Sequence, residues 1–138
     1  MSHLRWSLWL FALPVLMMAG AAPAGEPAEP VWTKTELYLG QNMPGGKIIS
    51  RDEWAAFLDG VVTRLFPQGL TVFEAYGQMQ HEDGTIERQT THVVMLVHPR
   101  EAASEKAVRE VITIFREKFK GAQVMHLSSP VAPEFYAD

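Results

Sequence analysis

The chain has 138 residues, no cysteine, and 16 acidic against 12 basic residues, for a formal net charge of −4 at pH 7. Without cysteine it can form no disulfide and no cysteine-linked lipid anchor, so packing alone must stabilise its fold. The acidic balance argues against nucleic acid or anionic lipid as a partner, because both select basic surfaces.

The first 24 residues have the pattern of an export signal. Arg5 supplies the positive start, the apolar run "WSLWLFALPVLMMAG" follows, and Ala22-Pro23-Ala24 fits a small-x-small cleavage site. A transmembrane anchor is the alternative, but a spanning helix needs about 20 apolar residues, and proline and glycine interrupt this run. We predict a signal peptide over residues 1–24, a periplasmic or secreted product, and no stable membrane anchor after cleavage.

The acidic, proline-rich stretch "GEPAEP", residues 25–30, is typical of a linker. Residues 31–138 are then long enough for a single α+β domain with its own core. In "VWTKTELYLG", residues 31–40, apolar and polar residues alternate, which predicts a strand. Leu37 and Leu39 would face the core, and Glu36 and Tyr38 the opposite side. The next segment, "QNMPGGK", is predicted to be a loop.

A helix should begin after Ser50, because Glu53 stands three residues later at capping-box spacing. Apolar residues then recur at steps of three and four and form one stripe: Trp54, Phe57, Leu58, Val61, Val62 and Leu65. Pro67 and Gly69 should end this helix.

Two strand patterns, "LTVFEAYGQMQ" and "IERQTTHVVMLV", flank Asp83-Gly84, a strong hairpin signal. A two-residue loop would pair Glu82 with Thr85 and Met79 with Arg88, and further along Ala75 with His92 and Phe73 with Val94. Two faces would follow from this register. The helix-facing side would carry Phe73, Ala75, Val94 and Leu96, and the opposite side Glu74, Tyr76, Gln78, Gln89, Thr91 and Val93.

The segment "EAASEKAVREVITIFREKF" predicts a second amphipathic helix, and "QVMHL" a short last strand before a proline-containing tail. The order predicts a ferredoxin-like βαββαβ sandwich, a four-stranded antiparallel sheet with two helices on one face. The first and third strands would be central. The other sheet face would then be bare or covered by a second subunit.

Three segments, "TELYLG", "SRDEWAAFLDGVVTRLFPQGLTVFEAYGQ" and "DGTIERQTTHVVMLV", carry a resemblance to a known family. They resemble the small secreted bacterial proteins grouped as domain of unknown function 3574. The resemblance runs from about Thr35 to Val97. It implies a class of exported protein and no particular reaction.

The predicted open face is the candidate site, with Glu36, Tyr38 and Gln78 as ligand-binding residues and Glu74 and Tyr76 as catalytic ones. A solvated sheet face or a dimer seam is the alternative interpretation of the same residues. Arg88 and His92 are further ligand-binding candidates on the helix side, although a charge that reaches solvent and a structural histidine explain them equally well.

No metal site and no cofactor is predicted. His92 and His98 lie about 20 Å apart along one strand at roughly 3.3 Å per residue, too far to share an ion. The sequence has no phosphate-binding loop, dinucleotide fingerprint or nucleophile elbow.

Two functions remain open. The first is a binding or interaction module that uses its open sheet face for a homodimer or for a small-molecule ligand. The second is a small cofactor-independent enzyme in a ferredoxin-like dimer. In it Glu74 would be the general acid or base, Tyr76 a proton donor, and Gln78 or Arg88 an anion stabiliser. An enzyme would need a concave pocket that converges on Glu74, whereas a module tolerates a flat seam.

Overall fold

The computed structural model describes residues 32–137, so the predicted signal peptide and linker lie outside the described residues. In chain order the long elements are β1 (Trp32–Gly40), α1 (Arg51–Phe57), β4 (Thr71–Gln80), β5 (Ile86–Pro99), α3 (Ala102–Lys118) and β6 (Val124–Val131). Within residues 32–137 no helix is long and apolar enough to span a bilayer.

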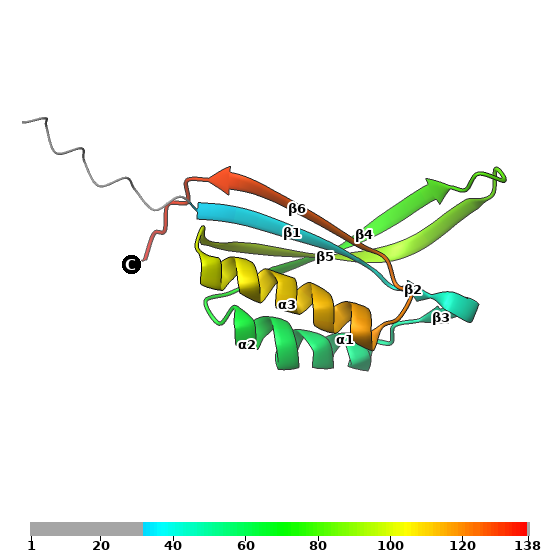
Figure 1. The fold of residues 1–138 in the computed structure, drawn as a ribbon, viewed down its shortest axis with the longest axis horizontal. Helices are drawn as coiled ribbons and strands as arrows, with labels where there is room; N and C mark the ends of the chain where they lie inside the picture. The colour runs from blue at the N-terminus through cyan, green and yellow to red at the C-terminus, as the bar shows by residue number, and fades with distance from the viewer. Residues whose placement is uncertain (1–31, 138) are drawn as a thin grey trace, which may run out of the picture.

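The main sheet has four antiparallel strands in the order β4-β5-β1-β6, and the helices cover one of its faces (Figure 1). β1 is central: Leu37 lies opposite Val94 of β5 on one side and His126 of β6 on the other. The predicted α+β class, with a four-stranded antiparallel sheet and two helices, is confirmed. Among residues 32–137, no helix lies against the other face of this sheet.

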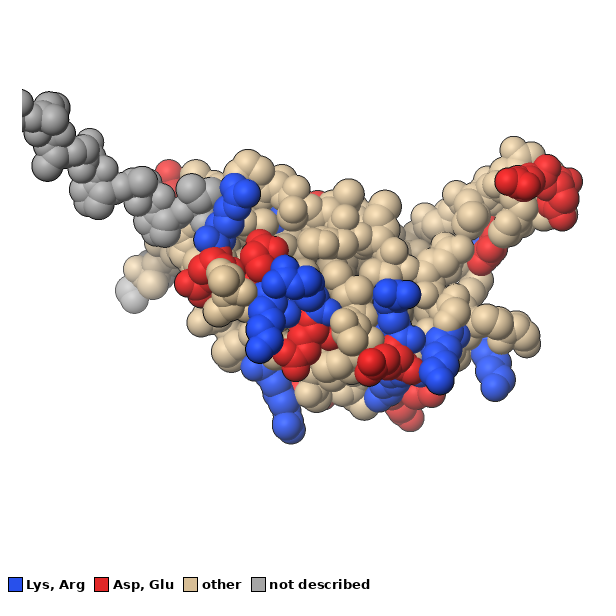
Figure 2. All heavy atoms as spheres, in the orientation of Figure 1, with Lys and Arg blue, Asp and Glu red and all other residues tan. Residues whose placement is uncertain are grey.

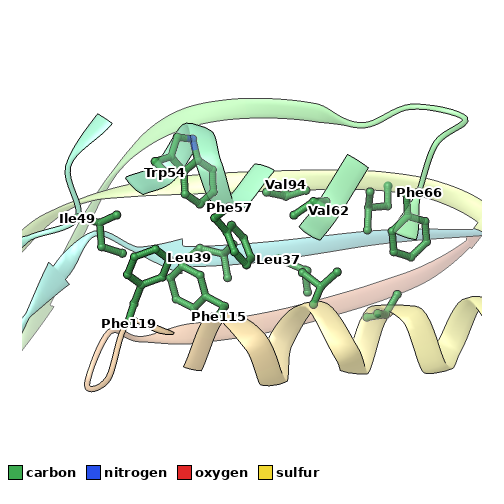
Figure 3. Packing of buried hydrophobic residues seen from close by; sticks show 13 residues of the cluster. Leu37, Leu39, Ile49, Trp54, Phe57, Val62, Phe66, Val94, Phe115 and Phe119 are labelled. Carbon is green, nitrogen blue, oxygen red and sulfur yellow. The ribbon is translucent and has the colours of Figure 1, made fainter. Parts of the chain in front are cut away.

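The core lies between the helices and the sheet (Figure 3). Phe57 from the first helix packs edge-on against Phe115 and Phe119 from α3, with ring centroids 5.4 and 5.9 Å apart. Leu37, Leu39, Val94 and Leu96 come from the two central strands and are at most 1% exposed. The predicted apolar stripes thus pack on the predicted inner residues of β1 and β5.

The first helix begins as the sequence indicates. Ser50 Oγ accepts the amide of Glu53, and the Ser50 amide donates to the Glu53 carboxylate at 2.9 Å. The helix continues through a π-helical turn, η2 (Leu58–Val62), into α2 (Thr63–Leu65). The π-helical turn changes the direction in which the predicted apolar stripe faces. Trp54, Phe57 and Val62 are buried, whereas Leu58, Val61 and Leu65 are only partly buried.

Two segments are more regular than predicted. The predicted loop after β1 is a small ribbon of β2 (Asn42–Met43) and β3 (Lys47–Ile48), joined by the 3-10 turn η1 (Pro44–Gly46). β6 continues beyond the predicted "QVMHL" to Val131 and includes Pro130. An edge strand tolerates proline because a missing N–H on its outer side breaks no ladder hydrogen bond.

The register of the β4–β5 hairpin differs by one residue from the prediction. The loop has three residues, since the His81 amide donates to the Thr85 carbonyl and Gly84 takes the left-handed conformation with φ 84°. Asp83 Oδ1 accepts the Thr85 amide at 2.9 Å and fixes this turn. Glu74 therefore lies opposite His92, Phe73 opposite Val93 and Gln78 opposite Arg88.

This slip moves every β4 side chain to the other side of the sheet. Phe73 and Ala75 lie on the open face, not on the helix side, and Glu74, Tyr76 and Gln78 lie on the helix side. The prediction for β4 was wrong in this respect. The predictions for β1 and β5 were correct, because Leu37 and Leu39 give β1 one clearly apolar side and their partners in β5 lie on the same side.

Candidate functional site: the open face of the sheet

The open face of the sheet, defined by the outward side chains of β4, β5, β1 and β6, is organised in rows that cross the strands. One row is entirely apolar or aromatic: Phe73, Val93, Tyr38 and Met125. The next row along the strands is Thr71, Met95, Glu36 and Leu127. Val93 is only 5% exposed although no helix covers it, because Phe73 and Tyr38 flank it.

The open face is unusually apolar for an uncovered surface. Its exposed apolar side chains and their exposed fractions are Phe73 49%, Met79 41%, Val97 36%, Met125 49% and Leu127 46%. Figure 2 shows that in this view most charged side chains gather over the helices and at the hairpin tip, while the sheet side is largely uncharged. Contiguous apolar surface of this kind marks an interaction site more often than a solvated face.

Lys34 and Glu36 are the charged pair at the centre of the open face. They project from the same side of β1, and Lys34 Nζ lies 3.3 Å from Glu36 Oε2. Both side chains are about one-quarter to one-third exposed. The two charges cancel, so the centre of this face has no net charge.

A hollow of about 260 Å³ lies on the open face near the base of the projecting hairpin. Its polar lining residues are Tyr38, Gln78, Glu87, Gln89, Thr91 and Gln123, so the predicted ligand-binding residues Tyr38 and Gln78 both border it. Met79 and Met125 are among its apolar walls. Thioether and aromatic walls with a few oriented amides suit a small, mostly neutral ligand.

The Gln89 amide lies in this hollow because Gly40 leaves room for it. A Cβ at Gly40 would stand 2.6 Å from Gln89 Oε1, whereas one at Gly77 would stand 3.1 Å from Thr91 Oγ1 and make ordinary contact with Gln89 Cγ at 3.5 Å. Gln89 Nε2 donates to Gln123 Oε1 at 3.0 Å, and the oxygen of Gln89 is buried without a hydrogen-bond partner among the described residues. Glycine within a strand marks such a close approach.

A larger hollow of about 790 Å³ lies at the opposite end of the strands. Trp32, Met95 and Val97 of the open face line it together with residues 65–71 and the first turns of α3, and Phe135 of the tail packs on Trp32 with ring centroids 5.5 Å apart. His98 also lines this hollow and is buried, with Nε2 2.9 Å from Thr35 Oγ1 and Nδ1 3.0 Å from the Pro99 carbonyl oxygen. Both ring nitrogens thus have partners, as expected of a structural histidine.

The register slip creates a contact that the sequence did not predict. On the helix side, Glu74 Oε2 lies 3.7 Å from His92 Nε2, and the His92 ring packs on Trp54 with centroids 4.4 Å apart. The Glu74 side chain is 77% exposed and that of His92 17%. His92 Nδ1 is buried with no partner among residues 32–137.

The structure divides the predicted site residues between the two sides of the sheet. Glu36 and Tyr38 lie on the open face as predicted. The helix side receives the others: Glu74, Tyr76, Gln78, Arg88 and His92. Tyr76 donates its hydroxyl to Gln78 Oε1 at 3.0 Å, so these two are also in contact. The catalytic and ligand-binding roles of these residues remain predictions.

Several residues that make the open face apolar and hollow were not predicted from the sequence. Phe73 and Met79 were not expected on this face, because the assumed loop had two residues and not three. Gln123 was not singled out, and only the pairing of β6 with β1 brings it near Gln89. Gly40 and Gly77 were the available signals, since a strand glycine often marks a close approach. Within residues 32–137 no group of three His, Asp or Glu side chains could hold a metal ion.

Comparisons with solved structures show a likeness of fold. A phage SAM lyase in complex with S-methyl-5'-thioadenosine has a TM-score of 0.53 and 12% sequence identity over 82% of this chain and 98% of that chain. A phage SAM lyase in the apo state gives 0.49 and 12% over 81% and 98%. No curated protein matches the sequence.

The family comparison confirms the resemblance seen in the sequence. The model of the family described as "Protein of unknown function (DUF3574)" matches residues 34–135, which includes the helices and all of the four long strands except the first two residues of β1. The chain therefore belongs to the DUF3574 family.

Proposed function

We propose that this protein is an interaction module that binds a protein partner through the open face of its sheet. The observation that supports this function is the set of five large apolar side chains on that face, each more than one-third exposed. Burying apolar surface contributes about 25 cal/mol of favourable free energy per Å². A partner that covers this face would therefore be held by the burial of its apolar side chains. The centre of the face has no net charge to oppose a partner.

A photo-cross-linking residue at Leu127 tests this function. The full chain is expressed, and the protein recovered from the cells is irradiated before and after purification. A matched variant carries the same residue at Lys106, which is exposed on α3 in the helical layer. We expect a protein adduct from position 127 and none from position 106. Equal yields from the two positions would exclude the open face as the binding surface.

We also infer that the chain is a ferredoxin-like sandwich that works outside the cytoplasm. The element order, with β1 and β5 in the middle of the sheet, supports this fold, and the β2–β3 ribbon and the projecting hairpin elaborate on it. The basic start and apolar run of residues 1–24 support export. The intact mass of the exported protein tests this, since cleavage after Ala24 would leave a chain that starts at Gly25.

A second candidate is a small cofactor-independent enzyme with Glu74 as general acid or base. The proximity of Glu74 and His92 favours it, because their side chains, 3.7 Å apart, place two groups capable of acid–base chemistry side by side. Tyr76, Gln78 and Arg88 lie on the same side of the hairpin and could orient a substrate. The fold shared with a phage SAM lyase is compatible with this function and names one compound to test.

Calorimetry with S-methyl-5'-thioadenosine tests the enzyme candidate. We expect binding by the native protein if this function holds, and at least tenfold weaker binding by Glu74→Gln, since about 1.4 kcal/mol corresponds to tenfold. Glu82→Gln, at the hairpin tip, is the matched control. No heat of binding, or equal affinity of both variants, would remove the support for a site of this kind at Glu74.

A further inference from the structure

We propose that the partner of the open face is a second copy of this chain. The two open faces would stack on each other, related by a twofold axis that runs between the sheets and across the strands at the level of Thr35. The two β1 strands would then lie over each other in opposite directions. This inference rests on the proposed function, because it names the partner of the same surface. Its evidence is the pattern of side chains on either side of Thr35 along the open face.

The charges of β1 are self-complementary about Thr35. Lys34 and Glu36 flank this residue and point to the open side. A twofold axis that crosses β1 here places Lys34 over the partner's Glu36, and Glu36 over the partner's Lys34. Four alternating charges would then form a closed cluster at the centre of the interface, where desolvation strengthens each attraction.

Part of the apolar surface also matches in this arrangement, whereas Leu127 would lie over the partner's Ser129. Positions equally far from Thr35 meet across a twofold axis, so Tyr38 would lie over the partner's Trp32. On β5, Met95 pairs with Glu36 and Val97 pairs with Lys34 within the sheet, so Met95 would lie over the partner's Val97. Aromatic and methionine side chains are enriched at the centres of protein interfaces.

Three strands of each copy overlap in this arrangement. β1, β5 and β6 each continue for three residues on either side of the Thr35 row, whereas β4 begins at Thr71, opposite Met95, and extends to one side only. At about 4.8 Å between strands and about 3.3 Å per residue the overlap covers roughly 330 Å² in projection. This is less than the roughly 800 Å² per partner of a standard interface, so we expect a dimer of modest affinity. Either hollow alone would leave most of this surface uncovered.

Charge reversal and sedimentation equilibrium test this arrangement, with protein recovered after expression of the full chain. We expect the native protein to be a dimer. Lys34→Glu and Glu36→Lys should each weaken the dimer about tenfold or more, because the axis turns one substitution into two like-charge contacts. The double variant Lys34→Glu/Glu36→Lys restores both pairs and should return the dissociation constant to within about threefold of the native value.

Lys106→Glu makes the same change of charge on α3, away from the sheet, and should leave the dimer intact. Thermal melts of all variants separate a loss of pairing from a loss of fold. A native monomer, or single reversals that behave like Lys106→Glu, would overturn the inference.

The cross-link at Leu127 distinguishes this failure from failure of the proposed function. An adduct of twice the chain mass supports the second copy. An adduct of another mass overturns the second copy and leaves an interaction module in place. No adduct at position 127 contradicts both.

Discussion

The two sides of the β-sheet carry side chains of similar hydrophobicity in opposite environments. The helix side buries Leu37, Val94 and Leu96 under Phe57 and Phe115, and its buried polar pair, Thr35 and His98, is hydrogen-bonded. The open side carries Phe73 and Leu127 at nearly half exposure. Stability accounts for the apolar residues of the first side and does not require those of the second, which are therefore the better indication of function.

Replacing one phenylalanine by alanine on each side of the sheet should show the largest difference in stability between the two sides. Phe57→Ala should lower the free energy of unfolding by about 3–5 kcal/mol, because it leaves a cavity between Phe115 and Phe119. Phe73→Ala, at 49% exposure, should cost less than about 1 kcal/mol and weaken binding at the open face. Urea denaturation followed by tryptophan fluorescence measures both, and similar losses would show that the open face contributes to stability as the core does.

Replacing one threonine by valine on each side of the sheet compares how much a buried and an exposed hydroxyl contribute to stability. Thr35→Val leaves the buried Nε2 of His98 without a partner and should cost about 1–3 kcal/mol. Thr71→Val changes an exposed threonine at the start of β4 on the open side and should cost almost nothing. The same denaturation experiment compares them. A neutral Thr35→Val would indicate that water replaces the hydroxyl.

A modest loss of stability is expected in the helical layer, at its first cap. Ser50→Ala should cost about 1 kcal/mol, because the Glu53 amide loses its acceptor. Ser128→Ala, on the exposed edge strand, is the matched control. Equal stability of the two variants would contradict a role for the capping box.

The same cap predicts a dependence on pH. Hydrogen bonds from the Ser50 hydroxyl and amide lower the pKa of the Glu53 carboxyl below its usual value. A lowered folded-state pKa adds stability above the unfolded-state pKa, and this contribution is lost as the pH falls through the folded-state pKa. Denaturation midpoints below about pH 5 should therefore fall less steeply for Ser50→Ala than for the native protein.

Much of the fold follows from local patterns. The capping box at Ser50, the apolar stripe of α3 and the alternation of β1 each specify an element, because period and cap chemistry are properties of a few neighbouring residues. The inner and outer sides of β1 and β5 were predictable for the same reason. Their outward residues Glu36 and Tyr38 were therefore placed correctly from sequence.

The candidate site was less predictable, because it depends on one turn. Asp83-Gly84 indicated a hairpin and was consistent with either a two- or a three-residue loop, and the two registers differ by one residue. Neither set of alternating β4 residues is clearly polar, since Phe73 and Met79 alternate with Val72 and Tyr76. Hydrophobic pattern alone could not choose the side of Glu74.

By itself the sequence determined the order of the helices and the four long strands, the α+β class, the family and the self-complementary order of Lys34 and Glu36 about Thr35. Only the tertiary structure decided which side of the sheet each β4 residue occupies. It also decided that Glu74 meets His92, and that Gln89 and Gln123 join across the hollow. The physical reason is that helix caps and strand alternation are local interactions, whereas strand register and pairing join residues far apart in the chain and depend on packing of the whole sheet.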